Sequence, residues 1–152
     1  MTAPGDMCWH CGEPLRGSAI HVRVGDTSRS VCCQGCGAAV EWIVQLGLGD
    51  YYRLRTVTAP RPRPYDAGLD AWQRPEIARH VVRELPGGQS EAMLLIEGVR
   101  CTGCVWLIER ALLGVPGVID AKVNAAARRA RVVWRAGAAT LPQLLEILSR
   151  AG

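Results

Sequence analysis

Two cysteines, Cys101 and Cys104, stand three residues apart where a predicted strand gives way to a predicted helix. Residues 92–96 form an apolar run typical of a strand, and apolar residues recur at helical spacing from Cys104 onwards. Unpaired N–H groups and the positive end of the helix dipole favour thiolate over thiol at a helix start. Two such thiolates, with no carboxylate or histidine nearby, suit a soft, low-coordinate ion such as Cu(I). The sequence therefore predicts a soft-metal site, although Cys-x-x-Cys is also typical of thioredoxin-like redox pairs.

The chain after this pair predicts a ferredoxin-like domain. Residues 118–124 and 130–135 alternate between apolar and polar side chains, as strands do when one face is buried. A second amphipathic helix follows, begun by Thr140 and Pro142. The resulting order, β-α-β-β-α, is that of a split βαβ fold.

Residues 91–152 resemble a heavy-metal-associated domain, whose usual motif is Gly-Met-x-Cys-x-x-Cys. This sequence departs from the motif at two positions: Val99 replaces the usual Met, and Arg100 replaces the usual small residue. The stretch 98–109 is most similar to the version in copper-transporting P-type ATPases that supply copper during assembly of cbb3-type cytochrome oxidases. The resemblance implies that Cys101 and Cys104 bind one Cu(I) and pass it between partners.

Five further cysteines lie between residues 8 and 36, in a knuckle, next to a predicted hairpin and at the start of a predicted helix. Such an arrangement brings four sulfurs together, as a structural zinc site requires. A module of about 50 residues buries little apolar surface, so a metal ion would supply much of its stability. The spacing resembles the treble-clef modules called TRASH domains, and the stretch as far as Arg55 resembles the cysteine-rich module that begins the same copper ATPases. The resemblance implies a zinc ion held by four ligands, Cys8, Cys11, Cys32 and Cys36.

Cys33 is the alternative ligand to Cys32. With Cys33, both pairs of ligands would have the spacing Cys-x2-Cys, which is the commoner spacing in zinc sites. We expect Cys32 to bind, since its three-residue gap matches the treble-clef relatives, and Cys33 to be the spare thiol. We expect His10 and His21 to be surface residues of the knuckle and hairpin. Sensing or relaying copper is the alternative role of this module, which five soft thiolates would allow.

Composition divides the chain into three segments: a cysteine-rich module over residues 1–55, a Pro- and Arg-rich linker over 56–75, and the heavy-metal-associated domain over 76–152. We expect the linker to be stiff and solvated. No run reaches the ~18 apolar residues of a membrane span, and the first residues lack a signal-sequence pattern. We therefore expect a cytoplasmic protein with reduced cysteines, at the cytosolic face of the inner membrane if it belongs to a full transporter. The net charge of +4 includes no basic run, which argues against nucleic-acid binding.

The predicted fold is α+β: a treble-clef-like module followed by a ferredoxin-like domain without its last strand, which would leave the first strand with a bare edge. Residues 80–85 have strand composition. We expect Val81–Leu85 to pair antiparallel with Ala92–Glu97 and to occupy that edge. A single helix over residues 76–85 is the alternative, because Ile77, Val81 and Leu85 also fit helical spacing.

The resemblance implies a cytosolic metal-binding region of a copper-transporting P-type ATPase, partnered by a copper chaperone and by the membrane and catalytic domains of its parent. The Asp-Lys-Thr-Gly phosphorylation motif is absent from the sequence, so we expect no ATP hydrolysis by this chain. One alternative function is a thiol-disulfide oxidoreductase that uses Cys101 and Cys104. Another is a protein-interaction module in which both cysteine clusters bind zinc.

Overall fold

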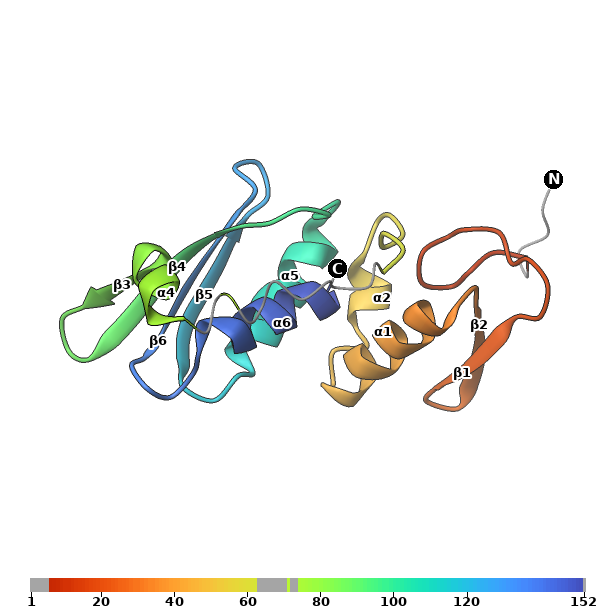
Figure 1. Ribbon diagram of the computed structural model, residues 1–152. Helices are drawn as coiled ribbons and strands as arrows, with labels where there is room; N and C mark the ends of the chain where they lie inside the picture. The colour runs from red at the N-terminus through yellow and green to blue at the C-terminus, as the bar shows by residue number, and fades with distance from the viewer. Residues whose placement is uncertain (1–5, 63–70, 72–73, 152) are drawn as a thin grey trace.

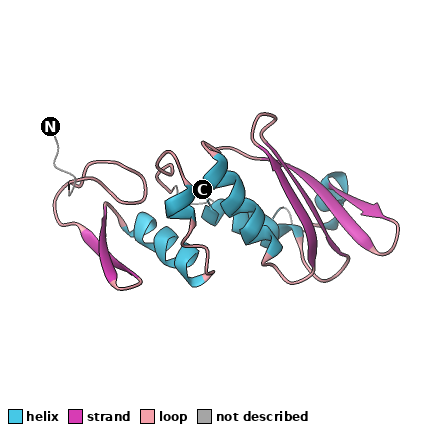
Figure 2. Ribbon diagram, turned by 180° about the vertical axis from the view of Figure 1, so that it is seen from behind, coloured by secondary structure: helices cyan, strands magenta, loops and turns pink. Residues whose placement is uncertain are grey.

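The computed structural model describes residues 6–62, 71 and 74–151, which form two modules (Figure 1). A two-stranded hairpin lies at one end of the molecule and a four-stranded sheet at the other, with helices of both modules between them (Figures 1 and 2). This mixed arrangement of helices and strands confirms the predicted α+β fold class.

The first module consists of a hairpin and two helices. Its elements are β1 (Ile20–Val24), β2 (Thr27–Val31), α1 (Gln34–Gln45) and α2 (Tyr51–Leu54). The strands pair antiparallel around a Gly25-Asp26 turn, where Gly25 has a φ of +60°. Gly47 follows α1 with a φ of +72°, a left-handed conformation that often ends a helix. The hairpin and α1 confirm the sequence prediction, whereas α2 has no counterpart in it.

The second module is a ferredoxin-like domain. Its elements are α4 (Pro75–Val81), β3 (Val82–Leu85), β4 (Gln89–Leu95), α5 (Thr102–Leu113), β5 (Val118–Asn124), β6 (Arg129–Arg135) and α6 (Leu141–Ala151). The strands form one antiparallel sheet in the order β3-β4-β6-β5. Helix α6 begins at a capping box, in which the Thr140 N–H donates to Gln143 Oε1 over 2.9 Å and the Gln143 N–H donates to Thr140 Oγ1 over 3.4 Å.

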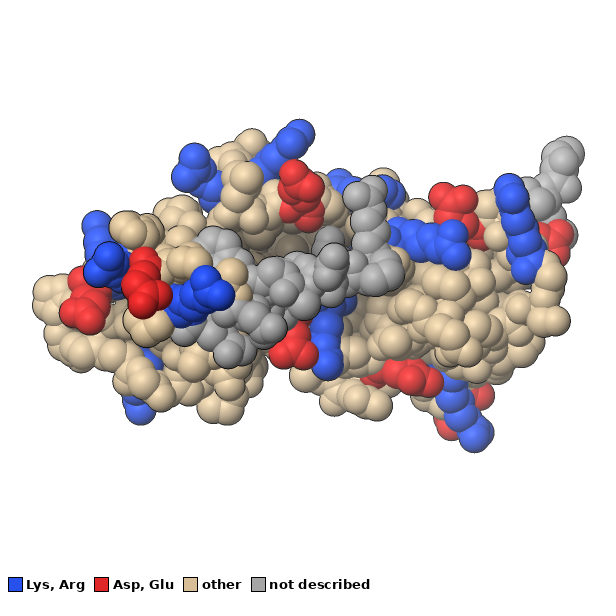
Figure 3. Space-filling view, viewed as in Figure 1, with Lys and Arg blue, Asp and Glu red and all other residues tan. Residues whose placement is uncertain are grey.

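One face of this sheet packs against α5 and α6, which lie beside it in Figure 2. The buried side chains there come from strands and helices alike: Leu94, Ile108, Leu112, Val132, Trp134 and Leu144. The opposite face carries an ion-pair network across all four strands. Glu91 of β4 accepts from Arg83 of β3 and from Arg131 of β6, and Arg131 reaches Asp120 of β5. Figure 3 shows another face of the molecule, where Lys and Arg are interspersed with Asp and Glu.

Strand β3 pairs with β4 and covers the edge that would otherwise be bare. The predicted hairpin is confirmed, but its register differs, because Val82–Leu85 pairs with residues 89–92 rather than with Ala92–Glu97. The turn is shorter than expected, since Gly87 and Gly88 both adopt positive φ and reverse the chain within residues 86–88. The alternative of a helix through residue 85 is wrong, because α4 ends at Val81.

The start of the linker folds back onto the first module. The Ala59 N–H donates to the His10 carbonyl over 3.2 Å, and Ala59 is buried. Pro62 lies beside Gly35 at the start of α1. The expected solvation of the linker is therefore wrong for Ala59; residues 63–70 and Trp72 lie outside the described residues. Within the described residues, no helix combines the length and apolar character needed to span a membrane.

The two modules share a core. Helix α2 packs against α5, and α1 against α6. Side chains from both modules are buried together at this junction: Ile43, Tyr51, Ala59, Cys104 and Leu107. The junction therefore includes one of the two cysteines of the predicted soft-metal pair.

Candidate metal centres

Four sulfurs of the first module lie together, those of Cys8, Cys11, Cys32 and Cys36, all within 4.8 Å of one another. The Cys11 and Cys32 sulfurs are 3.6 Å apart, and those of Cys32 and Cys36 are 3.7 Å apart. Zinc–sulfur bonds of about 2.3 Å in a tetrahedral site place sulfurs about 3.8 Å from one another. The group thus has the size of a four-thiolate zinc site.

Local structure brings these thiols together. The knuckle turns tightly because the Gly12 N–H donates to the Cys8 carbonyl over 2.9 Å, and Gly12 has a φ of +75°. The hairpin then leads to Cys32 directly after β2, and Cys36 lies in the first turn of α1.

Cys33 lies outside this group. It is the N-cap of α1, where its sulfur accepts the Cys36 N–H over 3.4 Å. Burial opposes its thiolate, but the Cys36 N–H and the side chain of Arg61 outweigh that effect and lower the Cys33 pKa to about 7. The geometry therefore gives Cys32 and Cys33 different surroundings although they are adjacent in sequence.

Two of the four grouped thiols, those of Cys32 and Cys36, resist ionisation when no cation is near. Burial raises the pKa of Cys36 far above its usual range, and the neighbouring Cys33 and Cys32 thiols add to the effect. Burial also raises the pKa of Cys32 to about 12, with a further contribution from the Cys11 thiol. A zinc ion among these sulfurs would hold them as thiolates, because metal binding displaces thiol protons.

His10 is not the surface residue that the sequence suggests. It is buried, and its Nδ1 hydrogen-bonds the Tyr52 hydroxyl over 2.8 Å. Burial and the nearby Arg55 charge lower its pKa to about 4, so the imidazole is neutral at pH 7. His21 is exposed, as expected, and hydrogen-bonds Ser30.

The second centre is the pair Cys101 and Cys104, whose sulfurs are 3.8 Å apart at the start of α5. Cys101 is the N-cap and is partly exposed, whereas Cys104 is only 6% exposed. The Tyr51 hydroxyl of the first module lies 4.0 Å from the Cys104 sulfur. The pair therefore lies at the junction between modules.

Cys101 is poised to be a thiolate. Burial opposes its charged form, but hydrogen bonds from the backbone of Thr56, Cys104 and Val57 outweigh that effect and lower the Cys101 pKa to about 7. Two of these three backbone groups belong to the start of the linker, directly after the first module. No local pattern in the sequence points to Tyr51, Thr56 and Val57, because they stand about 50 residues before the pair; the resemblance that extends to Arg55 is the one signal near them.

The two modules use the same local arrangement. Cys33-Gln34-Gly35-Cys36 and Cys101-Thr102-Gly103-Cys104 share a Cys-x-Gly-Cys pattern, with the first cysteine as the N-cap of a helix. Both N-cap residues are extended, with φ of −158° at Cys33 and −156° at Cys101. In the first module the second cysteine joins a larger cluster, whereas Cys101 and Cys104 stand as a pair.

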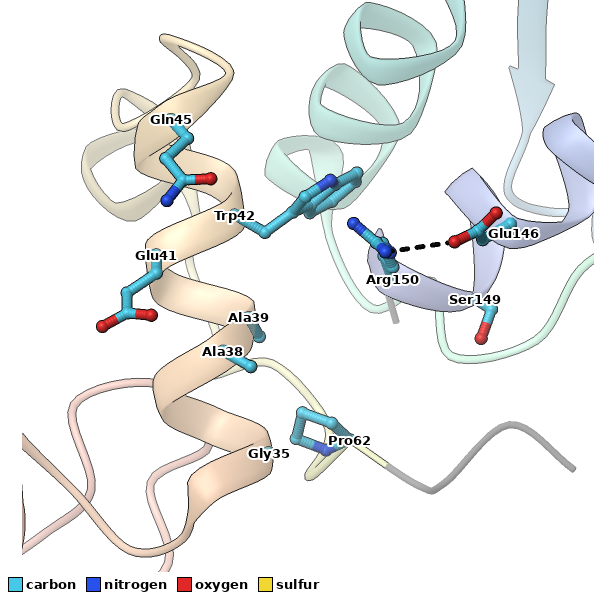
Figure 4. Close-up of a pocket in the computed structure, with 10 residues that line it drawn as sticks. All are labelled: Gly35, Ala38, Ala39, Glu41, Trp42, Gln45, Pro62, Glu146, Ser149 and Arg150. Atoms are coloured by element: carbon cyan, nitrogen blue, oxygen red, sulfur yellow. Dashed lines mark hydrogen bonds and ion pairs between the residues drawn. The ribbon is translucent and has the colours of Figure 1, made fainter.

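A groove of about 570 Å³ lies between α1 and α6 and holds no thiol among its described lining residues (Figure 4). Trp42 of α1 points toward α6, where Arg150 pairs with Glu146 over 3.1 Å. The groove is therefore separate from both groups of sulfurs.

Residues 7–85 match a metal-binding domain of cation transport ATPases, and residues 94–152 match the heavy-metal-associated domain. The chain belongs to the family of cation transport ATPase metal-binding domains. The first of these two matches extends to residue 85 and so includes β3. This strand is the edge strand of the four-stranded sheet in the second module.

Two relatives of this cation transport ATPase region illustrate the similarity. The chain is 37% identical over 73 residues to nitrogen fixation protein FixI of Bradyrhizobium diazoefficiens, covering 48% of this chain and 10% of FixI. It is 46% identical over 59 residues to copper-transporting ATPase 2 of Rhizobium meliloti, covering 39% of this chain and 7% of that protein. The aligned part thus spans a tenth or less of these relatives. No solved structure matches the chain.

Proposed function

We propose that Cys101 and Cys104 bind one Cu(I) as cargo and exchange it with a copper chaperone and with the other domains of a parent P-type ATPase. The observation that supports this most is the pair of sulfurs 3.8 Å apart at a helix start, in a chain of the cation transport ATPase family. Within the described residues, no third cysteine, histidine or carboxylate joins the pair in a larger ligand group. Two thiolates alone suit a soft ion of low coordination number.

The two cysteines have different roles in this exchange. Cys101 is the more exposed sulfur, and its lowered pKa makes a large share of it thiolate at neutral pH. It is therefore the first to replace a donor thiolate on the incoming ion. Cys104 then replaces the second donor thiolate, and the reverse order releases the ion.

The first cluster, in this proposal, holds a structural zinc ion through Cys8, Cys11, Cys32 and Cys36. Its supporting observations are the grouping of the four sulfurs and their placement in the small core of the module, where Val22, Val31 and Val40 are also buried. Bound by these four thiolates, a zinc ion would neutralise their charge and would cross-link the knuckle, the end of the hairpin and α1. The region would act on the cytosolic side of the membrane, while ATP hydrolysis belongs to other domains of the parent.

Anaerobic titration of zinc-loaded protein with Cu(I) against a competing chelator tests the copper site. We expect one Cu(I) per chain with sulfur coordination by X-ray absorption, and loss of that Cu(I) in the double variant Cys101→Ser/Cys104→Ser. Cys33→Ser is the matched control, since it removes a thiol that lies in neither group. Unchanged Cu(I) stoichiometry in the double variant would overturn the copper proposal, and binding of zinc alone would favour the interaction-module alternative.

The redox alternative predicts a different result. A thiol-disulfide oxidoreductase needs Cys101 and Cys104 to cycle through a disulfide with an oxidising potential. Equilibration with glutathione buffers and mass analysis measure that potential. We expect the pair to stay reduced at a cytosolic glutathione potential.

A further inference from the structure

A short segment at the end of the first module and the start of the linker lies directly on the Cys101–Cys104 pair. We call residues 51–57 the docking segment. Its Tyr51 ring is buried, with the hydroxyl 4.0 Å from the Cys104 sulfur, and its Thr56 and Val57 backbone lies close enough to the Cys101 thiol to help lower the pKa of Cys101. The segment therefore contacts both sulfurs of the pair.

Gly103, between the two cysteines, shows how close this contact is. A β-carbon on Gly103 would lie 2.8 Å from the Arg55 Cα and 2.9 Å from the Arg55 nitrogen. These are main-chain atoms, which cannot rotate away as a flexible side chain can. The docked arrangement thus depends on a glycine at position 103.

The docking segment is also fastened to the zinc-type cluster. The Arg55 guanidinium donates to the His10 carbonyl over 2.7 Å and to the Trp9 carbonyl, both inside the knuckle between Cys8 and Cys11. It lies over the Tyr52 ring, 4.7 Å from the centroid, and Tyr52 stacks on Trp9 at 4.0 Å. The knuckle and the docking segment are therefore one packed unit.

We propose that the docking segment is a built-in cover of the copper site, which must move off α5 before a partner can exchange Cu(I) with Cys104. The argument is steric. A donor or acceptor has to bring its own thiolates to both sulfurs, yet Cys104 is 6% exposed and the Tyr51 ring lies against it. The cysteine-rich module then competes with the transfer partner for the same face of the heavy-metal-associated domain. This inference rests on the proposed copper function for its biological meaning, but the covering itself can be tested without copper.

The test is alkylation of individual cysteines in zinc-loaded, copper-free protein with limiting iodoacetamide, followed by tandem mass spectrometry. Gly103→Ala should force Arg55 away, while alanine favours a helical position over glycine. We expect Cys104 to react at least about tenfold faster in this variant, as for a site released from a closed state. Gly49→Ala is the matched control, because a β-carbon there meets no atom within 4 Å and the backbone does not have positive φ. It should react at the wild-type rate.

Amide NMR of residues 94–150 shows whether the domain stays folded in Gly103→Ala. A folded variant whose Cys104 reacts at the wild-type rate overturns the cover. If the variant unfolds, Tyr51→Ala decides, since it removes the covering ring from the other module: faster Cys104 alkylation supports the cover, and an unchanged rate overturns it.

Copper delivery provides the second readout. Cu(I) supplied as its bicinchoninate complex should transfer faster to Gly103→Ala than to the wild type or Gly49→Ala. Equal transfer rates in all three proteins would overturn the gating role. If neither the wild type nor the variants bind Cu(I), the proposed function is overturned. The alkylation result would still establish or refute the cover in that case.

Discussion

The backbone of Arg55 lies against Gly103 so closely that a β-carbon at position 103 would be 2.8 Å from the Arg55 Cα. This contact joins the first module to the loop that carries the Cys101–Cys104 pair. It involves no charge and no metal, only the absence of a side chain. The same Arg55 holds the knuckle through its guanidinium, so a single residue contacts elements of both candidate metal centres.

Serine variants of the two adjacent cysteines should differ in zinc binding. We expect Cys32→Ser to lose the zinc ion, because its sulfur lies within the group of four. Cys33→Ser should keep it, since Cys33 lies outside the group and serine is itself a favoured N-cap residue. Elemental analysis with a thermal unfolding scan measures both. Greater destabilisation by Cys33→Ser than by Cys32→Ser would contradict the ligand assignment.

Loss of the Arg55 side chain should destabilise the first module. Arg55→Ala removes two charged hydrogen bonds to main-chain carbonyls, and we expect a cost of about 2 kcal/mol in the free energy of unfolding. Arg53→Ala is the control, because the Arg53 side chain makes an exposed ion pair with Asp50 and no other one within the described residues, so its loss should change stability by less than about 0.5 kcal/mol. Denaturant unfolding of the zinc-loaded protein compares them. Equal effects would mean that the Arg55 bonds contribute little.

Stability of the sheet should depend on the charge of Glu91. Hydrogen bonds from Arg83 and Arg131 lower the Glu91 pKa in the folded state. Because the pKa of Glu91 is lower in the folded state, the ionised carboxylate stabilises the folded sheet. This stabilisation is fully present above the unfolded-state pKa of about 4.3 and is lost as the pH falls through the folded-state pKa.

Glu91→Gln should therefore lower the melting temperature at pH 7 and have a smaller effect at pH 3. Signals of Trp134 in the core of the sheet report on this domain independently of acid loss of zinc from the other module. Glu84→Gln is the control, as Glu84 is exposed and pairs with no other described residue. An effect of Glu91→Gln that does not change with pH would exclude the electrostatic explanation.

Two glycines with positive φ should respond differently to alanine. Gly117 has a φ of +92°, and a β-carbon there would collide with the Ala138 side chain. Gly137 has a φ of +80° but open space around it. We expect Gly137→Ala to cost roughly 1–2 kcal/mol from the left-handed backbone alone, and Gly117→Ala to cost clearly more. Equal losses of stability for the two variants in thermal unfolding would show that the Ala138 side chain moves aside at no cost in free energy.

The local pattern of the sequence was sufficient for most of the regular elements. The hairpin of the first module follows from its turn residues, and α6 from apolar periodicity with a Thr140 start. The edge strand was also predictable, because a bare edge beside β4 needs a partner and residues 82–85 have strand composition. Its register was not, since it depends on how tightly Gly87 and Gly88 turn.

Short sequence spacing determines what each cysteine pair can do, because it places two thiols on one turn or at one helix start. The placement of Cys101 and Cys104 together at a helix start is therefore predictable from their spacing and their neighbours in the chain. The choice between Cys32 and Cys33 is different. Adjacent residues in extended backbone point in opposite directions, so only the path of the chain decides which sulfur reaches the group.

The docking segment is the feature that only the tertiary structure decided. Tyr51 and Cys104 are separated by 53 positions, and neither residue type nor spacing indicates that they meet. Their contact arises because two small modules bury apolar surface against each other, and the loop at Gly103 leaves room for the backbone of Arg55. The sequence thus determined which sulfurs lie together at a helix start, whereas packing between the modules determined how they are covered and helped to set the pKa of Cys101.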